Sequence, residues 1–357
     1  GWSVLASCGL FQGEGIQDTS RYQSAEEALQ QVEVIQPAIL FIQIGLYRLW
    51  RHCGVEPHVV VGHSLGEVAA AYASGGLSLR EAIAVIYHRS HQQAKLAGTG
   101  RMAALRATVD QAKKICQEHD NVYIAAINGP GAITLAGDSS EIEAIVAENP
   151  GKAKQLRVTC AFHTPEMDPI KKPFTQAMEG VIDTEEGKRH IPFYSSVTGH
   201  YHQEAFDAEY WWNNIRNPVL FQPALEDILQ DTDIDIFLEV SASATLLSCV
   251  KQIVRAFDPQ RSVTTINSSL RAKDDLHAMQ RAVGSLYVAG VDVDWKNITQ
   301  TTAQWAPIPT YPWQHQSFWL ETEERQKRRL GLDDRSFKGQ NGKITLSTFP
   351  FLADHVV

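Results

Sequence analysis

The stretch from His58 to Tyr72, HVVVGHSLGEVAAAY, constrains the fold of this chain more than any other. Its valines predict a short strand buried on both faces, as in a parallel sheet, and the small residues after Gly66 predict a helix. Between them lies the pattern Gly-x-Ser-x-Gly, typical of a strained turn that presents a nucleophile, here Ser64, at a helix N-terminus. Both glycines are expected to prevent collisions with neighbouring backbone. The stretch predicts an α/β fold with a nucleophilic serine, and a helix-capping serine is the structural alternative.

A serine nucleophile needs a base, and one histidine stands out among thirteen. His163 directly follows a predicted strand, in CAFHTPEMDPI, but a buried, hydrogen-bonded core histidine explains the pattern equally well. Arg89 lies in VIYHRSHQQ, within a helix that has an apolar face. It is either a surface arginine whose charge reaches solvent or a bidentate clamp for a substrate carboxylate.

The rest of the chain alternates helix-like and strand-like segments. Residues 1–100 and 160–295 predict a discontinuous core in which helices cover a parallel sheet, flavodoxin-like or α/β-hydrolase-like. Residues 101–159 have the order β-α-β-β-α-β of a ferredoxin-like subdomain inserted into that core. Residues 296–330, which are rich in prolines and aromatic residues between Trp305 and Trp319, predict a linker, and residues 331–357 predict the beginning of a further domain.

Composition argues against several other classes of protein. The net charge is −9, and the basic run RQKRR at 325–329 follows acidic residues, which predicts a solvated linker rather than a nucleic-acid site. The five cysteines include no Cys-x-x-Cys pair and give no disulfide framework. No signal peptide or apolar run near the roughly 18–20 residues of a membrane span is evident. We therefore expect a cytoplasmic piece of a longer protein, with no metal, nucleic-acid or membrane partner.

Several segments together resemble one family, the malonyl/acyl-CoA:acyl-carrier-protein acyltransferase domain of polyketide synthases and animal-type fatty acid synthases. They occur in the family's order and extend over about residues 1–321, which is far more specific than an isolated Gly-x-Ser-x-Gly pattern. The matching segments are GHSLGE (62–67), Arg89-Ser90, GRMAAL (100–105), INGP (127–130), AFHTPEMDPI (161–170), WWNNIRNPVLF (211–221), FLEVS (237–241) and PTYPWQHQSFWLE (309–321).

The resemblance implies a ping-pong reaction. Ser64 would attack the malonyl thioester of coenzyme A with His163 as general base, and the phosphopantetheine thiol of an acyl carrier protein would then take the acyl group. Arg89 would pair with the free malonyl carboxylate. The domain would bind no cofactor of its own, because coenzyme A and phosphopantetheine belong to its substrates. Ketosynthase and dehydratase domains of the same polypeptide would be its neighbours.

The resemblance also assigns supporting residues. The backbone N–H of Leu65 would form half of an oxyanion hole, and the main-chain carbonyl of Asn214 would orient the catalytic histidine. His63 and Gln36 would lie near the site. Phe162 would favour malonyl over methylmalonyl units, because its ring fills the space that an α-methyl group would occupy.

Three departures from the family pattern accompany these matches. The family's first strand, which supplies a second oxyanion donor, is expected just before Gly1. The family's EVSPHP is EVSASA at Glu239–Ala244, and Cys160 replaces a histidine or tyrosine three residues before the catalytic histidine. The final TFPFLADHVV resembles the opening of a dehydratase domain, in which His355 would match the catalytic histidine.

Two other functions remain possible from the sequence. One is an inactive docking fragment of such a synthase, which the missing strand and the linker-rich end favour. The other is an esterase or thioesterase of the α/β-hydrolase class, which also uses Gly-x-Ser-x-Gly but would require an acidic partner for its histidine.

Overall fold

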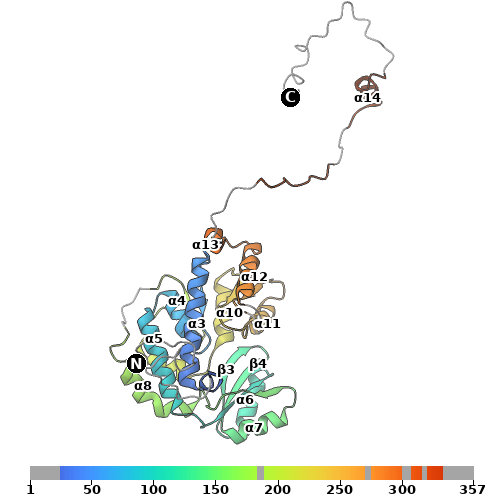
Figure 1. Cartoon of the computed structure of the whole chain (residues 1–357). Coiled ribbons are helices and arrows are strands. Elements are labelled where there is room, and N and C mark those ends of the chain that lie inside the picture. The colour runs from blue at the N-terminus through green and yellow to red at the C-terminus, as the bar shows by residue number, and fades with distance from the viewer. Residues whose placement is uncertain (1–24, 183–188, 270–274, 300–306, 316–319, 333–357) are drawn as a thin grey trace, which may run out of the picture. The chain divides into compact units, whose positions relative to one another are not determined.

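The computed structural model describes residues 25–182, 189–269, 275–299, 307–315 and 320–332 (Figure 1). The chain forms two compact units, residues 1–301 and 302–357. His355 and nearly all of the predicted domain beginning at 331 lie outside the described residues. In the described part of the first unit, the helices are α2 (Ala25–Ala28), α3 (Val32–His52), α4 (Gly66–Ser74), α5 (Leu79–Ala94), α6 (Val109–Glu118), α7 (Ser139–Glu148), the 3₁₀ helix η1 (Pro165–Ile170), α8 (Lys171–Met178), α9 (Ala208–Arg216), α10 (Phe221–Asp231), α11 (Leu247–Phe257), α12 (Asp275–Val288) and α13 (Trp295–Thr299).

The main core lies where α3, α4 and α5 meet α8 and α9. Leu40 and Ile44 of α3 are buried there, as are Val85 of α5, Phe174 of α8 and Trp211 of α9. The start of α5 carries the predicted capping box: the Ser78 hydroxyl accepts the Glu81 N–H, and the Glu81 carboxylate accepts the Ser78 N–H. This element of the sequence prediction is confirmed.

Helix α3 corrects the expectation that no segment is apolar and long enough for a membrane span. By length and composition alone, its 21 residues pass that test. Core helices of folded domains pass the same test, and α3 packs against α4 and α5 (Figure 1). Its ends carry Glu33, Arg51 and His52, and Trp50 is buried in a second apolar cluster.

The parallel strands form two separate pairs in the described residues. β1 (Val60–Val61) pairs with β6 (Phe193–Tyr194), and β7 (Ile236–Glu239) pairs with β8 (Thr264–Asn267). β1 and β7 are half-buried throughout, although their sequences predict burial on both faces. Among the described residues each strand has a single partner strand, so no described ladder covers its other edge, which is in keeping with the partial exposure.

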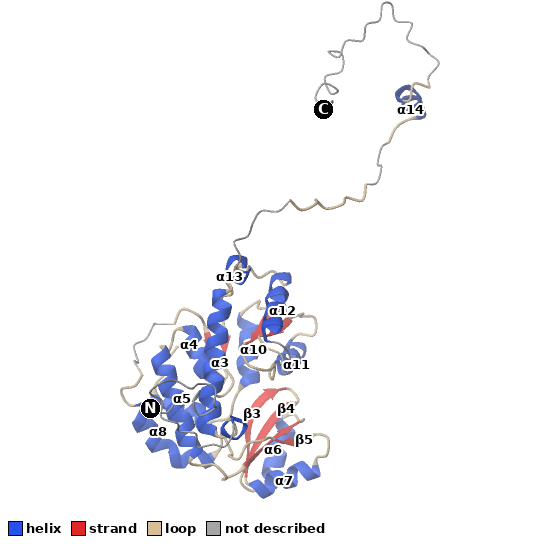
Figure 2. Cartoon of the chain, in the orientation of Figure 1, coloured by secondary structure: helices blue, strands red, loops and turns tan. Residues whose placement is uncertain are grey.

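Residues 101–155 contribute a separate antiparallel sheet (Figure 2). Its strand order is β3-β4-β2-β5, and the elements follow one another as β-α-β-β-α-β. Ile142 and Ile145 of α7 and Ala112 of α6 are buried in one cluster with side chains of the sheet. The strands are β2 (Arg101–Leu105), β3 (Val122–Gly129), β4 (Ala132–Gly137) and β5 (Ala153–Gln155).

Strand β3 also joins this sheet to the rest of the unit. Ala126 forms a parallel bridge with Val219, and the Ile127 N–H donates to the Val219 carbonyl over 2.8 Å. The Val219 N–H donates to the Ala125 carbonyl over 2.9 Å. The antiparallel sheet therefore holds the segment between α9 and α10 in register.

The second unit contains α14 (Glu323–Arg329), which carries acidic residues in its first turn and basic residues in its last. This arrangement complements the helix dipole.

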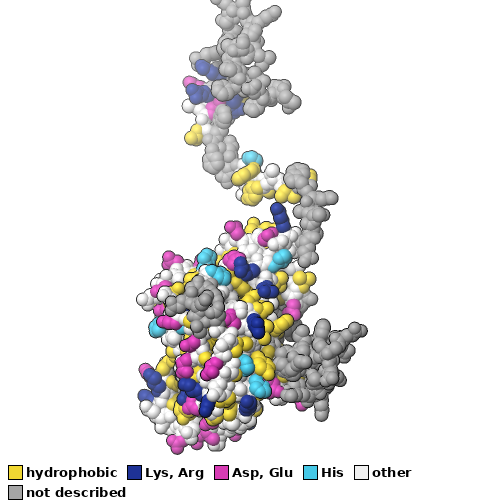
Figure 3. Space-filling view, turned by 90° about the vertical axis from the view of Figure 1, so that its left-hand side faces the viewer, with side chains coloured by type: hydrophobic (Ala, Val, Ile, Leu, Met, Phe, Trp, Pro, Cys, Tyr) yellow, Lys and Arg dark blue, Asp and Glu magenta, His cyan; other side chains and the backbone are white. Residues whose placement is uncertain are grey.

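On the face of the molecule in Figure 3, basic side chains lie among acidic ones rather than in one continuous patch.

Candidate active site

The Gly-x-Ser-x-Gly pattern forms a tight turn between β1 and α4. Ser64 has a φ of 53°, in the left-handed region that non-glycine residues seldom adopt. The turn is closed by the Gly66 N–H, which donates to the His63 carbonyl over 2.9 Å, and by the Glu67 N–H, which donates to the Ser64 carbonyl over 3.1 Å. Leu65 is the N-cap residue of α4. Its N–H therefore belongs to the helix end where backbone donors are available to an anion.

The two glycines of the turn are not equivalent. A Cβ on Gly62 would lie 2.3 Å from the backbone N and Cα of Glu67, closer than van der Waals contact allows. A Cβ on Gly66 would meet only the Gln43 side-chain nitrogen at 3.6 Å, an ordinary contact distance. The prediction that both glycines prevent collisions is therefore correct for Gly62 and wrong for Gly66.

We expect Gly62→Ala to destabilise the protein and Gly66→Ala to be tolerated. The Gly62 substitution forces backbone against backbone, and overpacking of this kind typically costs about 1–3 kcal/mol or more. Thermal unfolding followed by circular dichroism measures the difference. Equal melting temperatures for the two variants would contradict the steric argument.

His163 lies between β5 and η1 and contacts Ser64 directly. Its side chain is 5% exposed, and its Nε2 is 2.8 Å from Ser64 Oγ. Its Nδ1 is 2.9 Å from the main-chain carbonyl oxygen of Asn217. A carbonyl only accepts, so Nδ1 carries the proton and Nε2 is left to accept the Ser64 hydroxyl. The histidine is thus buried, as the core alternative predicted, but one of its two hydrogen-bond partners is the serine.

The carbonyl that orients His163 corrects the sequence prediction. Asn214 was expected to supply it, but the acceptor is Asn217, three residues later. Asn217 is the C-cap of α9 and has extended backbone angles (φ −86°, ψ 157°), so its carbonyl is turned out of the helical ladder. Asn214 contributes its side chain instead: its Nδ2 donates to the Ser64 carbonyl over 3.0 Å.

Burial determines the charge state of His163. It lowers the pKa of the imidazole to about 3, with smaller contributions in the same direction from the positive charge of Arg89 and from His63, and the Asn217 bond opposes them. The imidazole is therefore neutral at physiological pH, which is the form that accepts a proton.

Arg89 is buried beside the serine, at 2% exposure, so it is not the surface arginine of the alternative prediction. Its Nη2 donates to Ser64 Oγ over 3.1 Å. Burial lowers the pKa of its guanidinium to about 10, and the nearby Glu67 opposes this shift. The side chain therefore stays positively charged near pH 7.

The other nitrogens of Arg89 are held by amide oxygens. Its Nη1 donates to Gln36 Oε1 over 2.5 Å and to Gln93 Oε1 over 3.2 Å, and its Nε donates to Asn214 Oδ1 over 3.3 Å. Gln36 thus lies in the site, where the sequence placed it. Because Nε and Nη1 are engaged, Nη2 is the part of the guanidinium that faces Ser64, and the site presents no free bidentate edge.

His63 and Phe162 flank this centre in different ways. His63 bonds an amide of the antiparallel sheet: its Nε2 is 2.7 Å from Asn128 Oδ1, and Asn128 Nδ2 donates to Thr134 Oγ1 over 3.1 Å. Burial lowers the pKa of His63. Phe162 is half-buried and packs against both the main core and the cluster beneath the antiparallel sheet. Cys160 is fully buried, and its Sγ is 3.2 Å from the Leu96 carbonyl.

Three residues of this centre were not predicted from the sequence. They are Glu67, which is buried in the first turn of α4, Gln93, which lies one helical turn after Arg89, and Asn217. Glu67 and Gln93 each carried a signal, because a polar residue on the buried face of a predicted helix needs a polar partner.

Comparison with known proteins identifies the family to which this chain is similar. Residues 15–293 match the family described as acyl transferase domain. The mycoketide-CoA synthase of Mycobacterium tuberculosis is 32% identical over 362 residues, covering 95% of this chain and 9% of that protein.

Two solved structures are also similar. The acyltransferase domain from module 8 of the salinomycin polyketide synthase has a TM-score of 0.73 and 29% identity, over 83% of this chain and 67% of that one. The acyltransferase domain of SpnD, in complex with 2-(pent-4-yn-1-yl)malonyl, has a TM-score of 0.66 and 25% identity, over 76% of this chain and 65% of that one.

These matches agree with the serine turn and the Ser64–His163 contact, and they confirm the family expected from the resemblance. The chain belongs to the acyl transferase domain family, as an acyltransferase domain of the polyketide synthase type.

Proposed function

We propose that this domain transfers malonyl groups from malonyl-CoA to the phosphopantetheine thiol of an acyl carrier protein. One observation carries the proposal: Ser64 Oγ lies 2.8 Å from a neutral histidine nitrogen and 3.1 Å from a buried guanidinium. The first contact suits a nucleophile with its base, and the second suits an acyl group that carries a carboxylate, because it brings a fixed positive charge next to the serine.

In the first half-reaction, His163 Nε2 takes the hydroxyl proton while Ser64 Oγ attacks the thioester carbonyl. The negative charge that develops on the carbonyl oxygen is stabilised by the N–H of Leu65 at the start of α4. The intermediate then collapses: the C–S bond breaks, coenzyme A leaves, and its sulfur takes the proton from His163. The acyl group remains as an ester on Ser64.

The second half-reaction reverses these roles. The phosphopantetheine thiol gives its proton to His163 and attacks the ester carbonyl, and the departing Ser64 oxygen recovers that proton. No acidic residue is required, because the Asn217 carbonyl already fixes the tautomer of His163 from the other side of the ring. This carbonyl, in place of a carboxylate, also distinguishes the site from the triad that an esterase would use.

Two side chains account for the proposed preference of the domain for malonyl groups. Arg89 Nη2 pairs with the free carboxylate of malonyl through a charge-assisted hydrogen bond. Phe162 fills the volume beside His163 and disfavours an α-methyl group.

We further propose that the domain acts in the cytoplasm, between ketosynthase and dehydratase domains of one polypeptide. The small share of its curated relatives that this chain spans is in keeping with such a neighbourhood.

Intact-mass spectrometry after incubation with malonyl-CoA tests the proposal. We expect a malonyl adduct on Ser64 that is absent from Ser64→Ala and is lost again on addition of phosphopantetheinylated carrier protein. Methylmalonyl-CoA should react more slowly. A folded chain that takes no acyl group from either thioester would overturn the proposal and favour a docking role, whereas release of malonate to water would favour a hydrolase.

A further inference from the structure

Glu67 is a buried carboxylate that the proposed mechanism does not use. It is 0% exposed, in the first turn of α4. Its Oε1 accepts the Ser196 N–H over 2.5 Å and the Ser196 hydroxyl over 3.1 Å. Its Oε2 accepts the Tyr210 hydroxyl over 2.8 Å and Asn214 Nδ2 over 3.1 Å.

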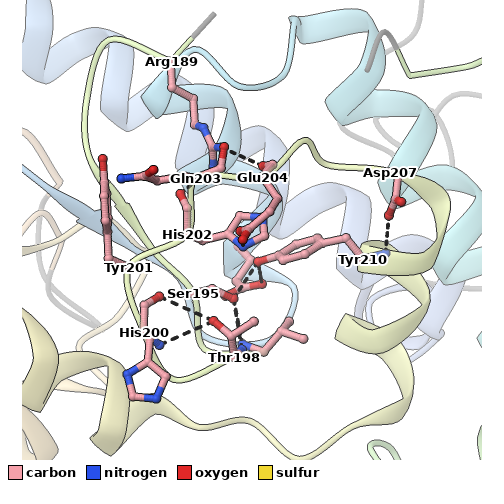
Figure 4. A network of polar contacts seen from close by, with 12 residues as sticks. Arg189, Ser195, Thr198, His200, Tyr201, His202, Gln203, Glu204, Asp207 and Tyr210 are labelled. Atoms are coloured by element: carbon pink, nitrogen blue, oxygen red, sulfur yellow. Dashed lines mark hydrogen bonds and ion pairs between the residues drawn. The ribbon is translucent and has the colours of Figure 1, made fainter. Parts of the chain in front are cut away.

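All of these partners are donors, which is the pattern that an ionised, acceptor-only carboxylate requires. Burial raises the pKa of Glu67, and the bonds from Tyr210, Ser196 and Asn214 oppose that rise. Tyr210 is fixed in turn, because its Oη is 2.7 Å from Ser195 Oγ (Figure 4). Since the only proton of Tyr210 goes to Glu67, the Ser195 hydroxyl must donate to Tyr210.

The amide of Asn214 connects Glu67 to the catalytic centre. Its Nδ2 donates to Glu67 and to the Ser64 carbonyl, and its Oδ1 accepts Arg89 Nε. The orientation of this amide determines whether Arg89 meets an acceptor or a donor. A carboxylate can only accept, so it forces the NH₂ group toward itself and the oxygen toward Arg89.

We propose that Glu67 is a positioning residue that aims Arg89 at Ser64 through the side-chain amide of Asn214. This inference rests on the proposed function, in which Arg89 selects a carboxylated acyl group. The hydrogen bonds run in one direction, from Arg89 to Asn214 and from Asn214 to Glu67, and the carboxylate at the end fixes that direction. Its negative charge also opposes the cost of burying the guanidinium, which is the direction of its effect on the pKa of Arg89.

Glu67→Gln keeps the size of the side chain but replaces one accepting oxygen with a donating NH₂ group, so the orientation of the Asn214 amide is no longer fixed. The Ser196 N–H belongs to the backbone and cannot rotate, so the new amide must keep its oxygen there. Its NH₂ then faces the NH₂ of Asn214, and this donor–donor contact is removed only if the Asn214 amide flips or moves away from residue 67. The flipped amide places a donor against Arg89 Nε and an oxygen against the Ser64 carbonyl, so Arg89 is pushed away from its position.

The rates of Ser64 acylation by malonyl-CoA and acetyl-CoA test this inference. We expect Glu67→Gln to lower the malonyl-to-acetyl ratio by about tenfold or more, the effect of losing one charge-assisted hydrogen bond. Asn214→Ala should lower the ratio similarly, and the double variant should be no worse than Asn214→Ala alone. Losses that multiply in the double variant, or an unchanged ratio in Glu67→Gln, would overturn the proposal.

Glu239→Gln is the matched control. The Glu239 carboxylate also accepts several hydrogen bonds, including those from the Thr245 and Leu246 N–H groups, but none from Arg89 or Asn214. We expect this variant to lower the melting temperature and to leave the malonyl-to-acetyl ratio unchanged. A fall in the ratio here as well would mean that general destabilisation explains the effect of Glu67→Gln.

A spectroscopic readout separates this inference from the proposed function. In a ¹H–¹⁵N NMR spectrum, the Nε–H signal of Arg89 is identified by its loss in Arg89→Lys. The chemical shift of this signal should change in Glu67→Gln and stay the same in Glu239→Gln. If the wild-type chain takes no acyl group, the proposed function fails while this signal still tests Glu67; an unmoved signal in Glu67→Gln overturns the positioning role.

Discussion

Replacing His163 by alanine is expected to slow the acylation of Ser64 by malonyl-CoA by roughly 10²–10⁴-fold, the usual contribution of a general base. The serine keeps its strained turn, but its hydroxyl loses the acceptor at 2.8 Å. A time course of the intact mass under single-turnover conditions measures the rate. The control is His119→Ala, which removes a histidine that pairs with Glu141 on the antiparallel sheet subdomain, and which should leave the rate unchanged. A His163→Ala rate within threefold of wild type would remove His163 from the mechanism.

The low pKa of His163 leads us to expect that the acylation rate and the stability depend differently on pH. Because burial lowers the pKa of His163 to about 3, the base stays deprotonated, and the acylation rate should be flat from pH 8 to pH 5. The free energy of unfolding behaves differently. Below about pH 6.5 the unfolded chain protonates His163 and His202, whose folded pKa values are about 3 and 4, so stability falls as pH decreases through this window. A rate that falls with a midpoint near pH 6.5, while the protein remains folded, would contradict the assignment.

The second large effect is expected at Arg89. Arg89→Ala should lower malonyl transfer by roughly 10–100-fold, because a charge-assisted hydrogen bond to the substrate carboxylate is worth about 1.5–3 kcal/mol. Acetyl transfer should be retained or increased, since acetyl carries no carboxylate and gains space. Separate rate measurements with malonyl-CoA and acetyl-CoA provide the comparison.

Arg48→Ala is the control for this experiment. Arg48 is an exposed arginine of α3 that donates to the Tyr72 hydroxyl over 2.9 Å, so its removal should leave both rates as they are. Equal losses of malonyl and acetyl transfer in Arg89→Ala would show that Arg89 only supports the fold around Ser64. That outcome would also remove the basis for a malonyl preference.

Local patterns in the sequence predicted the local structure well. The strand-turn-helix around Ser64 and the capping box at Ser78 depend on neighbouring residues, so they could be read from the chain directly. The order of elements in 101–155 followed from hydrophobic periodicity in the same way. The burial of β1 and β7 was predicted less well, because it depends on which strands lie beside them, and this is a property of the tertiary fold.

The pairing of Ser64 with His163 could not be derived from spacing, since 99 positions separate them. Their association was expected only through the family resemblance. The error at Asn214 has a different origin: which carbonyl faces the histidine depends on the residue at which α9 ends, and helix ends are the least certain part of a sequence prediction. Glu67 was missed because its partners Ser196, Tyr210 and Asn214 lie far away along the chain. Gln93 was missed because its role also depends on Gln36 of α3, although its other partner, Arg89, lies on the same helix.

The antiparallel sheet and the serine turn share hydrogen bonds that limit how this domain can be engineered. His63 is bonded to Asn128 of β3, and the same strand pairs with Val219, two residues after the carbonyl that holds His163. A chimaera that exchanges residues 101–159 with a relative cuts both connections. Such a graft must keep an amide acceptor at position 128 and the register of β3 on Val219, so the smallest exchangeable module is the sheet together with the residues it anchors.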